Sequence, residues 1–243
     1  MSDSSRTEAT PAASDTAGPV VQIPRRQILT EETYDAIMSL LISHQIEPGE
    51  RINIDALSRM LGVSVTPVRE TLARLESEAL VTKQALVGYT ATPLLTPEQL
   101  FELYEVRLAL EPLAARQAAL RANDEQLEKI GAATVERRDS ATGLDEHRLV
   151  AMDDERFHRA IGQAARNDFL SDALERLHSH LHLYRLYRNA RVVQEATLQE
   201  HESIVEALRR REPDAAARAM RAHLEASRAR LVDVIKGSLE TAR

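Results

Sequence analysis

The chain has 243 residues and a formal net charge of −7, with 43% hydrophobic residues, 3% aromatic residues and no cysteine. This length suits one large domain or two modest ones, and lack of cysteine excludes disulfides and thiolate metal sites. No apolar run approaches the roughly 18 residues that span a bilayer, and the N-terminus has no apolar segment typical of a signal peptide. We therefore expect a cytoplasmic protein without a membrane partner.

The first part of the chain changes character near residue 24. Residues 1–23 are rich in small and polar side chains without an apolar period, which predicts a disordered tail. From Thr30, as an N-cap, apolar residues recur at helical spacing, and a second short helix is expected to end at Gly62. A third helix is expected to start with Thr66 as N-cap and Pro67 as its first residue.

Two short extended segments follow the third helix, at 80–84 and 89–92, on either side of Gly88. Their spacing around a glycine predicts a hairpin. Three helices and a hairpin make a winged helix, and the tight link at Gly62 is typical of a helix-turn-helix. We therefore expect residues 24–93 to form a DNA-binding domain.

No strand pattern appears beyond residue 93, and helical periodicity continues through the rest of the chain. We predict that residues 94–243 form an all-helical domain. Its expected helices span about 96–122, 124–138, 145–166, 168–190, 194–211 and 213–238. The fold class is therefore mainly α, with an N-terminal winged helix-turn-helix and a C-terminal helical bundle.

The second helix of a helix-turn-helix enters the major groove and presents its N-terminal side chains to the bases. Here its exposed side offers Ser64, Thr66, Arg69 and Arg74, whose hydroxyl and guanidinium groups suit phosphate and base contacts. The alternative is that Arg69 pairs with a neighbouring glutamate and that Thr66 only caps the helix. Because residues 24–93 hold 7 Lys and Arg against 9 Asp and Glu, DNA binding depends on local placement of arginines.

Residues 28–93 closely resemble the DNA-binding domain of the GntR family. The matching segments are Pro48-Gly49-Glu50-Arg51-Ile52, Leu61-Gly62-Val63-Ser64 and Thr66-Pro67-Val68-Arg69-Glu70. The resemblance implies DNA contacts from Ser64, Thr66 and Arg69, with the wing near Gly88 reaching a minor groove.

The chain departs from this family pattern at two positions. Many GntR members carry arginine where this chain has Val65, and many carry glycine where it has Ala79. Because Val65 offers only an apolar contact, such as one with a thymine methyl group, the operator preference is expected to differ from the usual one. Ala79 bears on how tightly the third helix ends.

Four residues of the helical region form a candidate metal site. Asp154 and His158 are spaced i, i+4 and so share one helix face, while His201 and His223 lie in the apolar stripes of two further helices. A lone histidine on such a face is more often a hydrogen-bonded core residue. Three histidines and an aspartate facing one core need partners, and a divalent cation would satisfy all four. Their donor atoms suit zinc first, and also nickel, manganese or iron.

Residues 97–235 resemble the FCD domain, the C-terminal domain of FadR-type GntR regulators. The matching segments are Leu103-Tyr104-Glu105-Val106-Arg107, Leu110-Glu111, Asp154-Glu155-Arg156-Phe157-His158, Asn167, Glu200-His201 and His223-Leu224. The resemblance implies that Asp154, His158, His201 and His223 hold a divalent cation whose shell a small carboxylate effector completes.

Three further residues are candidate effector contacts. The FCD resemblance makes Arg107 one of them, because arginine can bind a carboxylate through two parallel hydrogen bonds. The alternative for Arg107 is an i, i+4 ion pair with Glu111. Tyr184 and Arg188 continue an apolar stripe and are expected to line the effector pocket.

A second histidine cluster lies in the expected helix 168–190. His178, His180 and His182 cluster there, and the i, i+4 pair His178 and His182 lies at the edge of the apolar stripe, without a carboxylate at matching spacing. We expect this cluster to be solvated or to face a second subunit.

The sequence therefore favours a homodimeric transcription regulator, expected to be a repressor, and not an enzyme. It would bind pseudo-palindromic operator DNA under the control of a small organic acid held at the metal site. One alternative is a constitutive DNA-binding protein with a structural metal, and another is a metal-dependent hydrolase. The hydrolase is disfavoured because Glu155, the nearest candidate base, points about 100° away from Asp154 on the helix.

Overall fold

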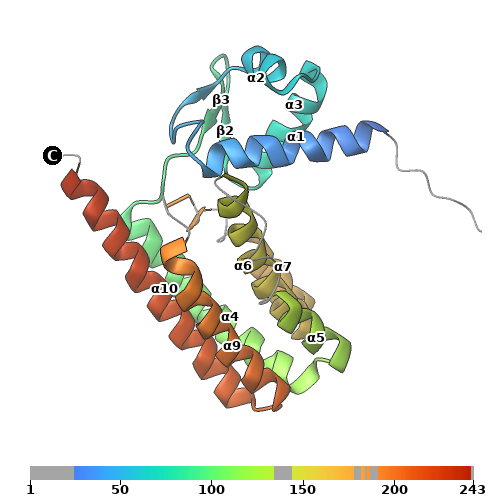
Figure 1. Cartoon of the computed structure of the whole chain (residues 1–243), viewed down its shortest axis with the longest axis vertical. Helices are drawn as coiled ribbons and strands as arrows, with labels where there is room; N and C mark the ends of the chain where they lie inside the picture. The colour runs from blue at the N-terminus through green and yellow to red at the C-terminus, as the bar shows by residue number, and fades with distance from the viewer. Residues whose placement is uncertain (1–24, 134–143, 178–181, 184, 187–190, 242–243) are drawn as a thin grey trace, which may run out of the picture.

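The computed structural model describes residues 25–133, 144–177, 182–183, 185–186 and 191–241. A small winged helix lies across one end of an elongated set of helices (Figure 1). This arrangement confirms the predicted fold class, mainly α with an N-terminal winged helix-turn-helix. The disordered tail predicted for residues 1–23 lies outside the described residues.

The winged helix contains three helices and a three-stranded antiparallel sheet with the strand order β1-β3-β2. Its elements are α1 (Arg25–Ile42), β1 (Arg51–Ile52), α2 (Ile54–Leu61), α3 (Val65–Ser77), β2 (Val81–Gln84) and β3 (Gly88–Ala91). The predicted hairpin is β2 and β3, whereas β1 was not predicted. A two-residue strand has no periodic pattern, and β1 exists because Arg51 and Ile52 pair with Thr90 and Tyr89.

Two of the predicted helix starts were wrong. Helix α1 begins at Arg25, so Thr30 lies inside it, and α3 begins at Val65 with Ser64 in the N-cap position. Pro67 still fits the first turn of α3, because the first four backbone amides of a helix have no partner within it. The predicted end of α2 is confirmed: Gly62 follows it with φ of +66°, in the left-handed region where glycine is favoured.

Helix α3 ends in a Schellman motif with alanine at the left-handed position. Ala79 has φ of +58°, its amide donates to the carbonyl of Glu76, and the amide of Leu80 donates to the carbonyl of Leu75. Leu75 and Leu80 are both fully buried, so the motif also carries the usual apolar contact. The helix therefore ends tightly even without glycine, at the cost of a strained alanine.

We expect Ala79→Gly to raise the free energy of unfolding by about 0.5–1 kcal/mol, because glycine removes the left-handed strain. Urea denaturation measures the change. Ala73→Gly in the exposed interior of α3 is the matched control, and it is expected to lower stability by about 1 kcal/mol. Equal destabilisation by both substitutions would contradict the assignment of strain to Ala79.

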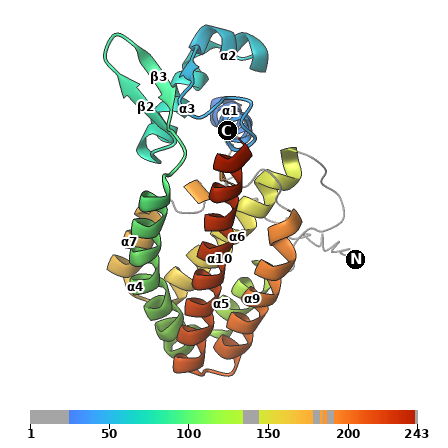
Figure 2. The same cartoon turned by 90° about the vertical axis from the view of Figure 1, so that its left-hand side faces the viewer.

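The helical half contains α4 (Pro97–Arg121), α5 (Asp124–Ala133), α6 (Leu144–Ala164), α7 (Asp168–Arg176), α9 (Arg191–Arg209) and α10 (Pro213–Thr241). The long helices α4 and α10 run side by side, α9 packs along α10, and α6 packs against α4 (Figure 2). Thr96 and Gln99 form a capping box at the start of α4. The helix predicted over 168–190 is shorter than expected, since α7 ends at Arg176.

Arg185 joins the two halves of the molecule. Its side chain is fully buried, its guanidinium donates a hydrogen bond to the carbonyl of Thr92 after the wing (2.5 Å), and its own carbonyl lies 2.7 Å from Nε2 of His44 beyond α1. Burial lowers the pKa of Arg185 to about 10. The helical half therefore contacts both the turn after the first helix and the segment after the wing.

Within the described part of the chain, the helices are too short or too polar for any of them to cross a membrane.

Candidate functional site

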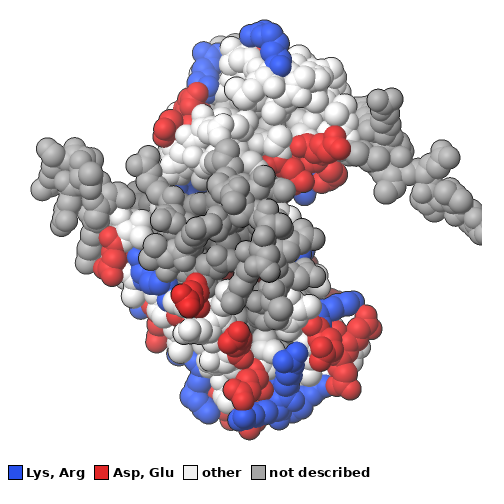
Figure 3. Space-filling model, viewed as in Figure 1, with Lys and Arg blue, Asp and Glu red and all other residues white. Residues whose placement is uncertain are grey.

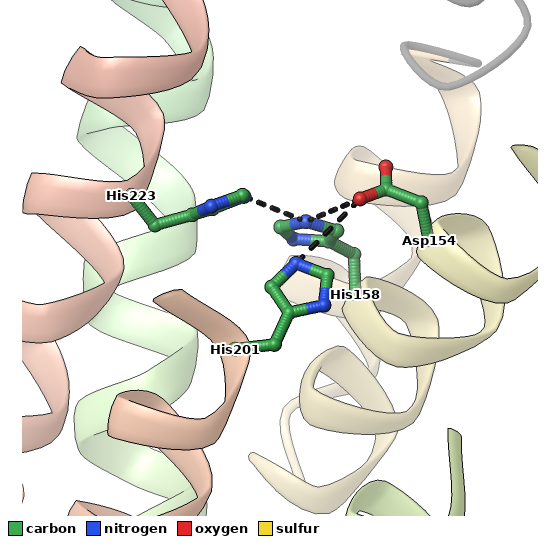
Figure 4. Close-up of side chains that lie close together, drawn as sticks. All are labelled: Asp154, His158, His201 and His223. Carbon is green, nitrogen blue, oxygen red and sulfur yellow. Dashed lines mark hydrogen bonds and ion pairs between the residues drawn. The ribbon is translucent and has the colours of Figure 1, made fainter. Parts of the chain in front are cut away.

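Three helices bring together the four residues that sequence analysis proposed as metal ligands. Asp154 and His158 extend from α6, His201 from α9 and His223 from α10, and all four converge on one point (Figure 4). One potential ligand atom from each residue lies within 4.8 Å of the others. The i, i+4 spacing places the α6 pair on one face, and the packing of α9 and α10 against the bundle brings in the other two.

The distances within this cluster leave a small space shared by nitrogen and oxygen donors. Oδ1 of Asp154 lies 3.7 Å from Nε2 of His158 and 3.5 Å from Nε2 of His201. Nε2 of His158 lies 3.3 Å from Nε2 of His223. Three imidazole nitrogens and one carboxylate oxygen are a donor set that zinc and other divalent first-row metals accept.

The protonation states of His201 and His223 suit the binding of a cation. Nε2 of His201 is buried and has no hydrogen-bond partner, although buried polar atoms normally have one. Burial lowers the pKa of His201 well below its usual value, and burial also lowers that of His223. Both rings are therefore neutral near pH 7 and carry a lone pair for a metal. Their role as ligands stays a prediction.

Phe157 holds His201 in place. The two rings are stacked, with centroids 3.8 Å apart and planes inclined by 16°. Phe157 is fully buried and belongs to α6, next to the ligand His158. The packing between α6 and α9 therefore sets the orientation of one candidate ligand before any metal binds.

Two glutamates contact the outer nitrogens of two of the histidines. Oε2 of Glu200 lies 2.8 Å from Nδ1 of His223, and Oε2 of Glu111 lies 2.6 Å from Nδ1 of His158. The sequence pattern alone indicates no role for Glu200, and it indicates Glu111 only as an ion-pair partner for Arg107. The one available signal was the position of Glu200 directly before His201.

Arg107 forms the ion pair that was the alternative to effector binding. Its Nε lies 2.5 Å from Oε1 of Glu111, one turn further along α4, and both side chains are buried. Burial alone would raise the pKa of Glu111, but above all the charge of Arg107 lowers it well below the usual range. An effector contact by Arg107 stays a prediction. The other effector candidates, Tyr184 and Arg188, lie outside the described residues.

The second histidine cluster can be placed only in part. His178 and His180 lie outside the described residues, while His182 is half-buried beyond the end of α7. The prediction that this cluster is solvated or faces a second subunit therefore stays a prediction.

The candidate DNA-contacting residues at the start of α3 lie at the surface. Ser64, Thr66 and Arg69 are exposed, and Val65 is half-buried. Gly88 begins β3 in the wing with φ of +97°, a backbone conformation that favours glycine. These positions agree with a recognition helix and a wing, and the DNA contacts themselves stay predictions.

Arg74 differs from the other candidates because its guanidinium is engaged within the protein. It lies 3.0 Å from Oε1 of Glu31 and 3.2 Å from Oε1 of Glu78, and it stacks 3.7 Å above the ring of Tyr34. Helix spacing predicts the exposed position of Arg74, but it gives no sign that α1 places Glu31 and Tyr34 beside the guanidinium. A contact between Arg74 and DNA would require the guanidinium to leave these partners.

On the face shown in Figure 3, charged side chains are distributed differently over the two halves of the molecule. Acidic and basic side chains intermingle at the end of the helical half that is remote from the winged helix, while the winged helix shows only a few charged side chains on this face. No broad basic patch appears in this view, which agrees with the acidic balance of residues 24–93. Contacts with phosphates would therefore depend on individual arginines.

Two family models match the chain in adjacent segments. Residues 29–90 match the model described as "Bacterial regulatory proteins, gntR family", and residues 102–226 match the FCD domain. The first segment covers the winged helix, and the second contains all four clustered residues.

Two operon regulators are similar to the chain over most of its length. The Uxu operon transcriptional regulator of Escherichia coli is 31% identical over 234 residues, covering 84% of this chain and 86% of that protein. The Nta operon transcriptional regulator of Aminobacter aminovorans is 29% identical over 202 residues, covering 82% of this chain and 93% of that protein.

Solved structures share the fold. McbR/YncC of Escherichia coli matches with a TM-score of 0.61 and 20% identity, covering 84% of this chain and 97% of that chain. A GntR structure from Rhodococcus sp. RHA1 matches with a TM-score of 0.66 and 20% identity, covering 85% of this chain and 98% of that chain.

Proposed function

The chain belongs to the GntR family of transcription regulators and carries an FCD domain, and from that premise we propose that a small carboxylate effector at a metal centre controls its binding to operator DNA. The family and the related proteins are transcription regulators, so the chain is not an enzyme, as sequence analysis predicted. The metal, the effector and the homodimer belong to the proposal.

One observation carries the proposal: four side chains that could hold a metal ion, two of them buried and two partly buried, cluster in the helical half of a chain whose other half is a winged helix. An effector changes DNA binding only if it has different affinities for two arrangements of the protein. Arg185 is a physical link through which the helical half contacts the winged helix, at Thr92 and His44. A change in the bundle would therefore reach the DNA-binding half.

We propose that a homodimer binds a pseudo-palindromic operator with one α3 in each half-site, because two-fold protein symmetry matches two-fold operator symmetry. Ser64, Thr66 and Arg69 would face the major groove, and the wing at Gly88 would face a minor groove. Repression is the expected outcome of this occupancy. Val65, where many members carry arginine, would alter the preferred bases.

One feature of the cluster favours a second candidate, a structural metal in a constitutive DNA-binding protein. Four protein ligands already complete the tetrahedral shell that zinc adopts in structural sites. An effector can join the shell only if the metal accepts a fifth or sixth ligand, as nickel, manganese and iron do. The identity of the bound metal therefore separates the two candidates.

A mobility-shift assay tests the proposed function. The protein is loaded with zinc, nickel or manganese, and small organic and sugar acids are titrated against a fixed concentration of operator DNA. The proposal expects at least one acid to change the operator affinity of the metal-loaded protein and to have no effect after chelation. Operator affinity that is independent of every acid with each metal would favour the structural-metal candidate.

Arg69→Ala is expected to weaken operator binding by about 1–3 kcal/mol and to relax the base preference at one position of each half-site. The exposed position of Arg69 in the first half of α3 is the reason. Binding is measured at fixed salt against operators substituted one position at a time. Arg210→Ala, in the turn after α9 and remote from α3, is the control and should leave operator binding unchanged.

A further inference from the structure

Two of the candidate metal ligands share the same outer arrangement, in which an arginine holds a glutamate and the glutamate contacts Nδ1 of a histidine. Arg230 and Glu200 form one such relay to His223, and Arg107 and Glu111 form the other to His158. We propose that Glu200 and Glu111 are positioning residues that keep the proton of each ring on Nδ1 and so direct Nε2 to the metal. This inference rests on the metal centre of the proposed function.

The relay to His223 joins α9 and α10. Nη1 and Nη2 of Arg230 lie 2.6 and 2.9 Å from the two carboxylate oxygens of Glu200, and Oε2 of Glu200 accepts from Nδ1 of His223 at 2.8 Å. Glu200 is thus an acceptor held on both sides, suited to fix one ring orientation.

The relay to His158 joins α4 and α6. Nε of Arg107 and Nδ1 of His158 lie 2.5 and 2.6 Å from the two carboxylate oxygens of Glu111. The contact with His158 is close without meeting hydrogen-bond alignment, so this relay is the looser of the two. It nevertheless connects the metal centre to α4, a helix that supplies none of the four candidate ligands and that is the next element after the wing.

The relays have a direct chemical consequence. A neutral imidazole carries one N–H group and one lone pair, and the hydrogen bond made by one nitrogen decides which nitrogen has the proton. Nε2 of His158 and Nε2 of His223 lie 3.3 Å apart, at hydrogen-bond distance. With protons on both Nδ1 atoms neither Nε2 can donate, so two lone pairs face each other. Two opposed lone pairs repel, and a cation between them removes the repulsion. The relays therefore prepare the centre for a metal.

Metal affinity of the full-length protein tests the inference. Zinc binding is measured by competition with a chelating dye for the natural sequence and for Glu200→Ala, Glu111→Gln and Glu200→Gln. Glu206→Ala is the matched control, because Glu206 lies on α9 like Glu200 but forms an exposed ion pair with Arg210. We expect Glu200→Ala to lower affinity by about 10–100-fold and the control to leave it unchanged. Glu111→Gln is expected to lower affinity by a few-fold.

The conservative variant and the tautomer separate positioning from a general structural role. The amide oxygen of Glu200→Gln can still accept from Nδ1–H, so this variant should recover most of the affinity. Long-range ¹H–¹⁵N NMR spectra of the metal-free protein should show His223 protonated on Nδ1 in the natural sequence and a mixture of tautomers in Glu200→Ala. A structural defect alone would not change the tautomer.

Each outcome decides a different point. Zinc affinity and His223 tautomer unchanged in Glu200→Ala would overturn the relay and leave the metal centre standing. Absence of zinc binding to the natural sequence would overturn both. If Glu200→Ala does not fold, Arg230→Ala replaces it, because this variant releases the Glu200 carboxylate without removing it. The relay would then be overturned if Arg230→Ala binds zinc as tightly as the natural sequence and keeps the His223 proton on Nδ1.

Discussion

Replacing His223 with alanine is expected to remove tight metal binding and, with it, the response of operator binding to the effector. A tightly bound metal has a binding free energy of about 10–16 kcal/mol, which is about 3 kcal/mol for each of four ligands. Loss of one ligand should therefore lower metal affinity by roughly 100-fold. His223 is buried, and water cannot readily replace its nitrogen. Metal analysis of the purified protein and mobility shifts with effector measure the two losses.

Thermal unfolding gives an independent reading of the same prediction. A metal at 100 times its dissociation constant stabilises the natural protein by about 2.7 kcal/mol, and a chelator removes that gain. His223→Ala and Asp154→Ala should unfold at the same temperature with and without chelator. Asp153→Ala is the matched control, since Asp153 pairs with Arg156 instead of joining the cluster. Natural metal content and effector response in both ligand variants would refute the metal centre.

Breaking the ion pair between Arg107 and Glu111 is expected to cost about 3–5 kcal/mol of stability, because each single substitution leaves a buried charge without its partner. Arg107→Met and Glu111→Leu are the single variants, and the double variant removes both charges. The double variant should be more stable than the sum of the two single losses predicts. Urea denaturation of the metal-free protein completes the double-mutant cycle.

A surface ion pair provides the comparison for this cycle. Arg116 and Asp214 join α4 to α10 at 3.1 Å, with side chains that are 51% and 71% exposed. Arg116→Ala should cost less than about 1 kcal/mol, because water solvates the remaining carboxylate. A coupling energy between Arg107 and Glu111 as small as that of the surface pair would show that the buried pair is not required for the fold.

The spacing of residues along the chain was sufficient to predict features that depend on one continuous segment. Apolar periodicity predicted the winged helix and most of the helices, and the i, i+4 spacing placed Asp154 and His158 on one face. The helix ends at Gly62 and Thr96 follow from their own backbone and capping preferences. The apolar stripes of two further helices added His201 and His223 to the candidate site, and the resemblance implied the same four residues.

Features that depend on contacts between two distant segments could not be predicted from residue spacing. Strand β1 exists only because β3 lies beside it, and Arg74 is engaged because α1 presents Glu31 and Tyr34 to it. Arg74 is exposed, as its own helix predicts, but its partners on α1 could not be derived from that helix. The same limit hid the Arg185 contacts, which join residues 93 and 141 positions apart.

The sequence by itself determined the two functional halves and the four side chains of the candidate metal centre, because periodicity, caps and residue type act within one helix or are carried by a family resemblance. Tertiary structure alone decided what surrounds those side chains: Glu200 at His223, Glu111 at His158 and the Arg185 link to the winged helix. Such contacts depend on the angle and register at which helices pack, and spacing along one helix does not specify either.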